Sequence, residues 1–151
     1  MFGGGIDRKA IELKPNSYTY FVKQAAGEVV EAAVIVSTRP FSARYDLDRK
    51  SGIFSREGHP LKGQSIVGKI LVAPSVQGGV AAGWALPSMA QLGVGFAGLL
   101  FGSVNPVMVQ GALAAGIPIG AELPDDFFAA IKTGDVVRFD PASRTVTIFC
   151  N

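Results

Sequence analysis

The chain has 151 residues and a formal net charge of +2, which suits one domain that can bury a substantial core. Its 14 Lys and Arg residues are scattered along the sequence, so there is no basic patch for binding nucleic acid. A lone cysteine, Cys150, and a lone histidine, His59, exclude an internal disulfide framework and a cysteine-only metal site. We therefore expect no metal site made by this chain alone.

The N-terminal part of the chain has weak patterning. Residues 1–27 are predicted to be an extension, mobile at its Gly3-Gly4-Gly5 start, and residues 28–151 are predicted to be the folded domain. The first residues lack the apolar core of a signal peptide, so we expect a cytoplasmic protein. Within the domain, residues 31–38 are rich in β-branched side chains and predict the first strand.

Residues 70–121 contain no Asp, Glu, Lys, Arg or His, whereas a typical domain carries about one charged residue in four. A membrane-spanning helix would need about 20 consecutive, mostly apolar residues. This segment is instead interrupted by ten glycines and by four prolines, Pro74, Pro87, Pro106 and Pro118. We therefore interpret the uncharged segment as the interior of an α/β domain and expect no contact with a membrane.

The uncharged segment alternates short apolar stretches with helical ones. Asn105 followed by Pro106 is typical of a helix start, and Gly116 is typical of a helix end. The predicted elements are a strand at 70–73, a helix at 79–92, a strand at 94–101, a helix at 106–115 and a strand at 117–120. This order predicts a parallel sheet covered by helices.

The C-terminal part returns to a charged, alternating pattern. Residues 124–132 have acidic residues at the start and a lysine at the end, which favours a short helix. Residues 136–139 and 145–149 are predicted to pair as a hairpin. The fold class is therefore α/β, with a mostly parallel core sheet and a flanking β-hairpin.

Ligands of open α/β sheets bind at the carboxyl ends of the parallel strands. The predicted strand at 70–73 is followed by residues 74–79, which read Pro-Ser-Val-Gln-Gly-Gly. Backbone N–H groups at the glycines could hold a carboxylate or a phosphate, with the Ser75 hydroxyl and the Gln77 amide beside them. The alternative is a plain turn between a strand and a helix. The segment is not a P-loop, because no Gly-Lys-Ser/Thr follows.

Three of the basic side chains that precede this loop are candidates for ligand binding or catalysis. His59 could act as a base or carry a phosphoryl group, or it could form a backbone hydrogen bond in its own loop. Arg39 and Arg44 could pair with a ligand carboxylate, or they could be solvated surface residues. No complete set of acid, base and metal ligands is present, so the chain carries half of an active site.

Residues 59–75 read His-Pro-Leu-Lys-Gly-Gln-Ser-Ile-Val-Gly-Lys-Ile-Leu-Val-Ala-Pro-Ser. This segment resembles the small subunit, or swivel domain, of the aconitase X family. Flanking matches lie at residues 37–42, Ser-Thr-Arg-Pro-Phe-Ser, and at residues 132–137, Lys-Thr-Gly-Asp-Val-Val. The resemblance extends over about residues 28–149 and implies the swivelling β/β/α fold.

The resemblance also implies a function and a partner. Members of the family dehydrate hydroxy acids, with cis-3-hydroxy-L-proline and mevalonate 5-phosphate as known substrate types. The chain would be the small subunit of a heteromeric hydro-lyase, inactive without a large subunit that holds an iron–sulfur cluster, and it would bind no cofactor alone. Ser75 is the implied catalytic acid/base group. The residues expected to bind substrate are Ser42, Arg44, Gln77, Gly78 and Gly79.

This chain departs from the family pattern at the loop. The family's usual loop reads Pro-Ser-Gly-Arg-Gly-Ser-Ser. In this chain Gln77 stands in place of the arginine, and Gly79 and Val80 stand in place of the two later serines. Without this arginine the loop lacks a guanidinium suited to a phosphate group, which favours cis-3-hydroxy-L-proline over mevalonate 5-phosphate as the substrate. Arg44 is a candidate to replace the positive charge of the missing arginine. The alternatives are a phosphomevalonate dehydratase small subunit, a non-catalytic binding or regulatory subunit, and a phosphohistidine carrier that uses His59.

Overall fold

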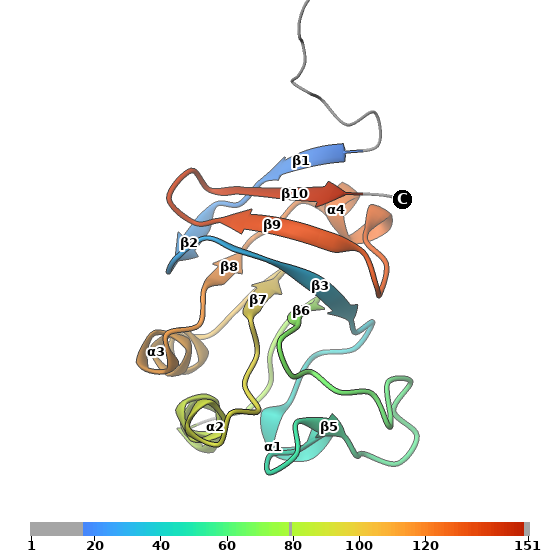
Figure 1. Ribbon diagram of the computed structural model, residues 1–151, viewed down its shortest axis with the longest axis vertical. Coiled ribbons are helices and arrows are strands. Elements are labelled where there is room, and N and C mark those ends of the chain that lie inside the picture. The colour runs from blue at the N-terminus through green and yellow to red at the C-terminus, as the bar shows by residue number, and fades with distance from the viewer. Residues whose placement is uncertain (1–16, 79, 150–151) are drawn as a thin grey trace, which may run out of the picture.

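The computed structural model describes residues 17–78 and 80–149. Figure 1 shows a curled sheet with two helices packed on one side of it. The strands are β1 (Ser17–Phe21), β2 (Gln24–Ala26), β3 (Val30–Val36), β4 (Leu47–Asp48), β5 (Ile53–Phe54), β6 (Ile70–Ala73), β7 (Gly98–Phe101), β8 (Ile119–Ala121), β9 (Val136–Asp140) and β10 (Thr145–Phe149). The helices are α1 (Ala43–Asp46), α2 (Val80–Gln91), α3 (Pro106–Ala115) and α4 (Asp125–Ala130).

The main sheet has the strand order β1-β10-β9-β3-β6-β7-β8-β2. Strands β3, β6, β7 and β8 run parallel to their neighbours in this group, whereas β9 and β10 form an antiparallel hairpin that joins β3. Helices α2 and α3 connect the parallel strands and pack against each other on one side of the sheet (Figure 1). This arrangement confirms the predicted fold class of a mostly parallel core sheet with a flanking hairpin.

Both edge strands of the main sheet come from one N-terminal segment. Strand β1 pairs antiparallel with β10, and β2, only two residues further along the chain, pairs antiparallel with β8. Residues 17–26, which the sequence assigned to an extension, are therefore part of the sheet. A strand of three residues, such as β2, is too short to give a clear period. The predicted mobile start at Gly3-Gly4-Gly5 lies outside the described residues.

Hydrophobic side chains form two cores, one on each face of the parallel strands. One core lies beneath α2 and α3, and the other is enclosed by the hairpin and α4. Strand β6 contributes Leu71 and Ala73 to the first core, and Ile70 and Val72 to the second. All four residues are buried, as expected for a parallel strand that is covered on both faces. The strands of the uncharged segment lie in the interior, as predicted, whereas part of the surface of α2 and α3 is exposed, including Trp84, Leu92 and Leu113.

Helix α3 begins and ends where the sequence predicted. The side chain of Asn105 accepts a hydrogen bond from the Met108 N–H at 2.9 Å, and Gly116 ends the helix at a φ of 71°. These caps satisfy backbone groups that have no partner within the helix. In the described part of the chain, no helix has both the length and the apolar character needed to cross a membrane.

The strands on either side of α3 are shorter than predicted. Strand β7 begins at Gly98, because the backbone N–H of Val94 donates to the Met89 carbonyl at the end of α2 instead of joining the sheet. Strand β8 begins at Ile119, after Pro118, which has no backbone N–H to donate to a neighbouring strand. The sequence alone does not show at which residue the backbone stops bonding to the preceding helix and begins to bond to a neighbouring strand.

Candidate active site

Three loops meet at the carboxyl edge of the parallel strands. They comprise residues 37–42 after β3, residues 74–78 after β6 and residues 102–105 after β7. Backbone hydrogen bonds continue the sheet into these loops, from the Ser37 N–H to the Val72 carbonyl at 2.8 Å and from the Gly102 N–H to the Ala73 carbonyl at 3.2 Å. The edge is therefore ordered by the sheet itself.

The middle loop, which carries Ser75, is held from both sides. On one side, the Phe41 N–H donates to the Ser75 carbonyl at 2.8 Å, and the Gln77 N–H donates to the Phe41 carbonyl at 2.7 Å. On the other side, the Asn105 side-chain amide donates to the Gly78 carbonyl at 3.4 Å. The backbone of the loop is thus held by Phe41 on one side and by Asn105 on the other, while Val76 packs against the core.

The residues predicted in this loop differ in what they offer a ligand. Ser75 is half-buried, and among the described residues its hydroxyl has no hydrogen-bond partner. Gln77 and Gly78 are exposed, and Gly78 has a φ of 112°, which strongly favours glycine. Gly79, also predicted to bind substrate, lies outside the described residues.

The two substrate-binding residues predicted upstream lie at the start of α1, with Ser42 as its N-cap and Arg44 in its first turn. Ser42 is 2% exposed, and its side-chain oxygen accepts a hydrogen bond from the Tyr45 N–H at 3.3 Å as the N-cap of this helix. Its hydroxyl therefore stabilises a helix start. Arg44 is exposed, and its guanidinium lies 5.2 Å from the centre of the Tyr45 ring. At this distance the ring attracts the positive charge of the guanidinium through a cation–π contact.

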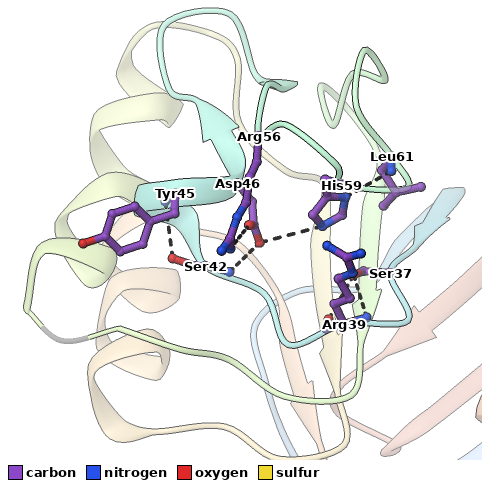
Figure 2. A network of polar contacts seen from close by, with 8 residues as sticks. All are labelled: Ser37, Arg39, Ser42, Tyr45, Asp46, Arg56, His59 and Leu61. Carbon is purple, nitrogen blue, oxygen red and sulfur yellow. Dashed lines mark hydrogen bonds and ion pairs between the residues drawn. The ribbon is translucent and has the colours of Figure 1, made fainter.

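A buried polar network lies next to the loop of residues 37–42, and no local sequence pattern indicates it. Figure 2 shows Asp46 contacting Ser42, Arg56 and His59. The Asp46 carboxylate is 1% exposed; one oxygen accepts from the Ser42 N–H at 2.8 Å, and the other accepts from Arg56 Nη1 at 3.1 Å. Desolvating a carboxylate is costly unless it is paired and hydrogen-bonded, and Asp46 is both.

His59 completes this network. Its Nδ1 accepts a hydrogen bond from the Leu61 N–H at 3.0 Å, and its ring stacks on Phe54 at 4.8 Å between centroids. A neutral ring with an accepting Nδ1 carries its proton on Nε2. Nε2 lies 3.9 Å from an oxygen of Asp46 and has no hydrogen-bond partner in the described part of the chain.

The protonation state of His59 follows from its surroundings. Burial lowers its pKa below the usual value, and the positive charges of Arg39 and Arg56 lower it further, while the negative charge of Asp46 opposes them. Protonation would also require Nδ1 to give up the hydrogen bond from Leu61. The buried, neutral ring with an occupied Nδ1 does not favour the phosphohistidine interpretation, because a phosphoryl carrier must reach a donor in solution.

A curled mixed sheet, with helices on one face of its parallel strands and ordered loops at their carboxyl edge, is the architecture of swivelling β/β/α domains. A family model described as the aconitase X swivel domain matches residues 19–148. This chain therefore belongs to the aconitase X swivel-domain family.

Individual relatives agree with this assignment. The chain is 32% identical over 117 residues to the phosphomevalonate dehydratase small subunit of Methanopyrus kandleri. The aligned region covers 78% of this chain and 87% of that protein. It is also 32% identical over 120 residues to the protein of the same name from Pyrococcus horikoshii, with 80% and 87% covered. The crystal structure of Thermococcus kodakaraensis aconitase X in its holo form has a TM-score of 0.80 at 27% identity, over 87% of this chain and 98% of that one.

Proposed function

We propose that this chain is the small, swivel subunit of a heteromeric aconitase X-type hydro-lyase that dehydrates a small hydroxy carboxylate. The observation that carries the proposal is the Ser75 loop. It lies at the carboxyl edge of the parallel strands, held by the Phe41 backbone on one side and by the Asn105 side chain on the other. The Ser75 hydroxyl has no hydrogen-bond partner among the described residues, and Gln77 and Gly78 are exposed. Ligands of α/β sheets bind at this edge, and the family match covers the whole loop.

Ser75 has the position of a proton-transfer group in this proposal. Dehydration breaks a C–H bond next to the carboxylate and a C–O bond on the neighbouring carbon, forms a double bond and releases water. The hydroxyl of Ser75 serves as the acid/base group at the reacting carbons. The Gln77 side chain and the backbone near Gly78 hold the carboxylate through neutral hydrogen bonds, and Arg44 adds a cation at the rim.

The expected iron–sulfur cluster belongs to the partner in this proposal. The described residues include no group of three or more His, Cys, Asp or Glu side chains that could hold a metal ion. They do not fit a cluster site, so we assign the cluster to the large subunit. The contribution of this chain is the loop that closes over a substrate held by that subunit.

The surface of α2 and α3 supports a protein partner. Neither helix carries a charged residue, and Trp84 on α2 is 69% exposed beside an apolar groove between the two helices. Exposed apolar surface of this kind marks interaction sites. Because the Ser75 loop leads directly into α2, a large subunit that closes over the loop also reaches Trp84.

We propose a substrate without a phosphate group, of the cis-3-hydroxy-L-proline type. Gln77 stands where an arginine would provide a charged, bidentate phosphate contact, and a neutral amide suits a smaller anion. Mevalonate 5-phosphate is the second candidate substrate, because relatives with about a third identical residues carry the name phosphomevalonate dehydratase small subunit.

The test is reconstitution with a large subunit of the aconitase X family. The chain and the large subunit are assayed alone and mixed, with cis-3-hydroxy-L-proline and with mevalonate 5-phosphate as substrates. We expect a stable complex that dehydrates the hydroxyproline, with neither subunit active alone. A W84S variant is expected to weaken association about tenfold or more, whereas the exposed-site variant R138Q leaves it unchanged.

The other outcomes of this experiment separate the alternatives. Turnover of mevalonate 5-phosphate alone would assign the second candidate. A complex that turns over neither compound would favour the non-catalytic binding or regulatory subunit. If no complex forms with any large subunit of the family, the proposal is wrong.

A further inference from the structure

We propose that Asp46 is a positioning residue that holds the Ser75 loop in its working geometry through the backbone of residues 41 and 42. The link to turnover rests on the proposed function, whereas the structural link can be measured without any substrate. Asp46 itself does not touch the loop, and at 1% exposure its side chain is not available to a ligand.

The first step of the connection runs from the carboxylate to the loop after β3. One oxygen of Asp46 accepts a hydrogen bond from the Ser42 N–H at 2.8 Å, and the Ser42 carbonyl accepts from the Asp46 N–H at 2.9 Å. Ser42 also caps the same turn with its side chain. These bonds fix the backbone conformation of Ser42, which is extended at a φ of −127°.

The second step runs from this backbone to the candidate active site. Phe41, next to Ser42, makes an isolated parallel bridge with Val76. Its N–H donates to the Ser75 carbonyl and its carbonyl accepts from the Gln77 N–H, at 2.8 and 2.7 Å. A shift of residues 41 and 42 therefore moves Ser75 and Gln77 together, because the two segments are joined by both bonds.

The third step explains why the carboxylate itself stays in place. Arg56 holds the second oxygen at 3.1 Å, and the backbone N–H of Ser55 donates to the Asp46 carbonyl at 2.9 Å. The Nε2 of His59 lies 3.9 Å from the first oxygen, and His59 is fixed in turn by Leu61 and Phe54. Asp46 is thus anchored by residues 55–59, which lie outside the parallel sheet (Figure 2).

Hydrogen exchange of single amides tests the structural link in the full-length chain. In D46A we expect the amides of Phe41 and Gln77 to exchange about tenfold faster or more, while amides within β6 keep their protection. The matched control is D48A, because Asp48 is exposed and its side chain accepts hydrogen bonds from its own turn, such as that from the Lys50 N–H at 3.0 Å. D48A should leave Phe41 and Gln77 unchanged.

A second variant keeps the test valid if D46A does not fold. D46N retains the size of the side chain and one acceptor oxygen, but it turns a donor toward Arg56, so it should accelerate the same two amides only a few-fold. D48N is its control. If Phe41 and Gln77 keep wild-type protection in every Asp46 variant that folds, while only Ser42 loosens, Asp46 caps its own turn and the proposal is wrong.

The kcat of an active complex tests whether Asp46 affects the reaction. In an active complex, D46A should lower kcat about tenfold to a hundredfold, since a displacement of about 1 Å at a reacting group costs that much, and D46N should recover part of it. D48A should match the wild type. Loosened amides with unchanged kcat would overturn the positioning role. Loosened amides in a chain that forms no active complex would count against the proposed function and not against the Asp46 link.

Discussion

Two segments that meet at the Ser75 loop are built on opposite principles. Residues 70–121 carry no charged side chain and form the parallel strands β6, β7 and β8 and both large helices. Residues 37–66 contain little regular structure and are held by a buried carboxylate, its arginine and a histidine. The first segment places the loop by packing, and the second aligns it by hydrogen bonds. Substitutions in the two segments should therefore fail in different ways.

The loop itself should show the largest effect on turnover and almost none on folding. S75A is expected to reduce kcat of the reconstituted complex about 10²- to 10⁴-fold, the usual contribution of a positioned acid or base. The free energy of unfolding should stay within about 0.5 kcal/mol of the wild type, because the hydroxyl makes no bond within the described chain. Steady-state kinetics and urea unfolding give the two values. Unchanged kcat would remove Ser75 from the chemistry.

The uncharged segment should show the reverse pattern, and the contact between α2 and α3 is its most sensitive point. A Cβ added at Gly111 would lie 2.5 Å from the Gly83 carbonyl oxygen. The helices would have to move apart, and overpacking of this kind costs about 1–3 kcal/mol. G111A should therefore lower the free energy of unfolding by about 2 kcal/mol, measured in urea.

The control for G111A lies on the same helix. Gln110 is exposed, and Q110A should change stability by less than about 0.5 kcal/mol. A G111A protein as stable as the wild type would mean that the two helices are not in such close contact.

Asn105 contributes both to the stability of the fold and to the position of the Ser75 loop. It caps α3, and its side chain also donates to the Gly78 carbonyl. N105A should lose the cap and about 1 kcal/mol of stability. N105D keeps a capping oxygen, so its stability should stay near that of the wild type, but it lacks the donor to Gly78. Thermal unfolding separates the two variants, and exchange of the neighbouring Gln77 amide, which donates to the Phe41 carbonyl, should rise in both. Equal loss of stability in N105A and N105D would show that capping is not what Asn105 contributes.

How far the sequence predicted the fold differs between the same two segments. In residues 70–121 local signals were sufficient, because capping residues, glycines and apolar runs report on neighbours close in the chain, and the order of strands and helices was correct. The strand limits were wrong by a few residues, and β1 and β2 were missed altogether. Their pairing with β10 and β8 joins segments far apart in the sequence, which no local period reveals.

The candidate site shows the same division. The loop that carries Ser75 was found from its place after a buried strand and from a family resemblance, and its role stays a prediction. The sequence does not indicate that Asp46 is buried, because an acidic residue near Asp48, Arg49 and Lys50 is typical of a solvated turn. Its burial depends on Arg56 and His59. Only the folded chain brings a partner to each of its two oxygens.

The buried network should also make the free energy of unfolding depend slightly on pH. The pKa of His59 is lowered in the folded chain, whereas an unfolded chain binds a proton near the ordinary value of about 6.5. The unfolded state therefore holds more protons below that pH, so the stability from the neutral ring is present above about pH 6.5 and is lost as the pH falls. One proton limits the slope to about 1.4 kcal/mol per pH unit.

H59N isolates this effect, because the amide oxygen of asparagine can accept from the Leu61 N–H as Nδ1 does, yet it cannot titrate. Urea unfolding from pH 7.5 to 5 should show wild-type stability falling more steeply than that of H59N, whatever the difference at pH 7.5. Parallel curves would mean that His59 takes up its proton without cost in the fold. The ring would then face Asp46 as a cation, and the polar segment would be held by a full ion pair instead of a neutral donor.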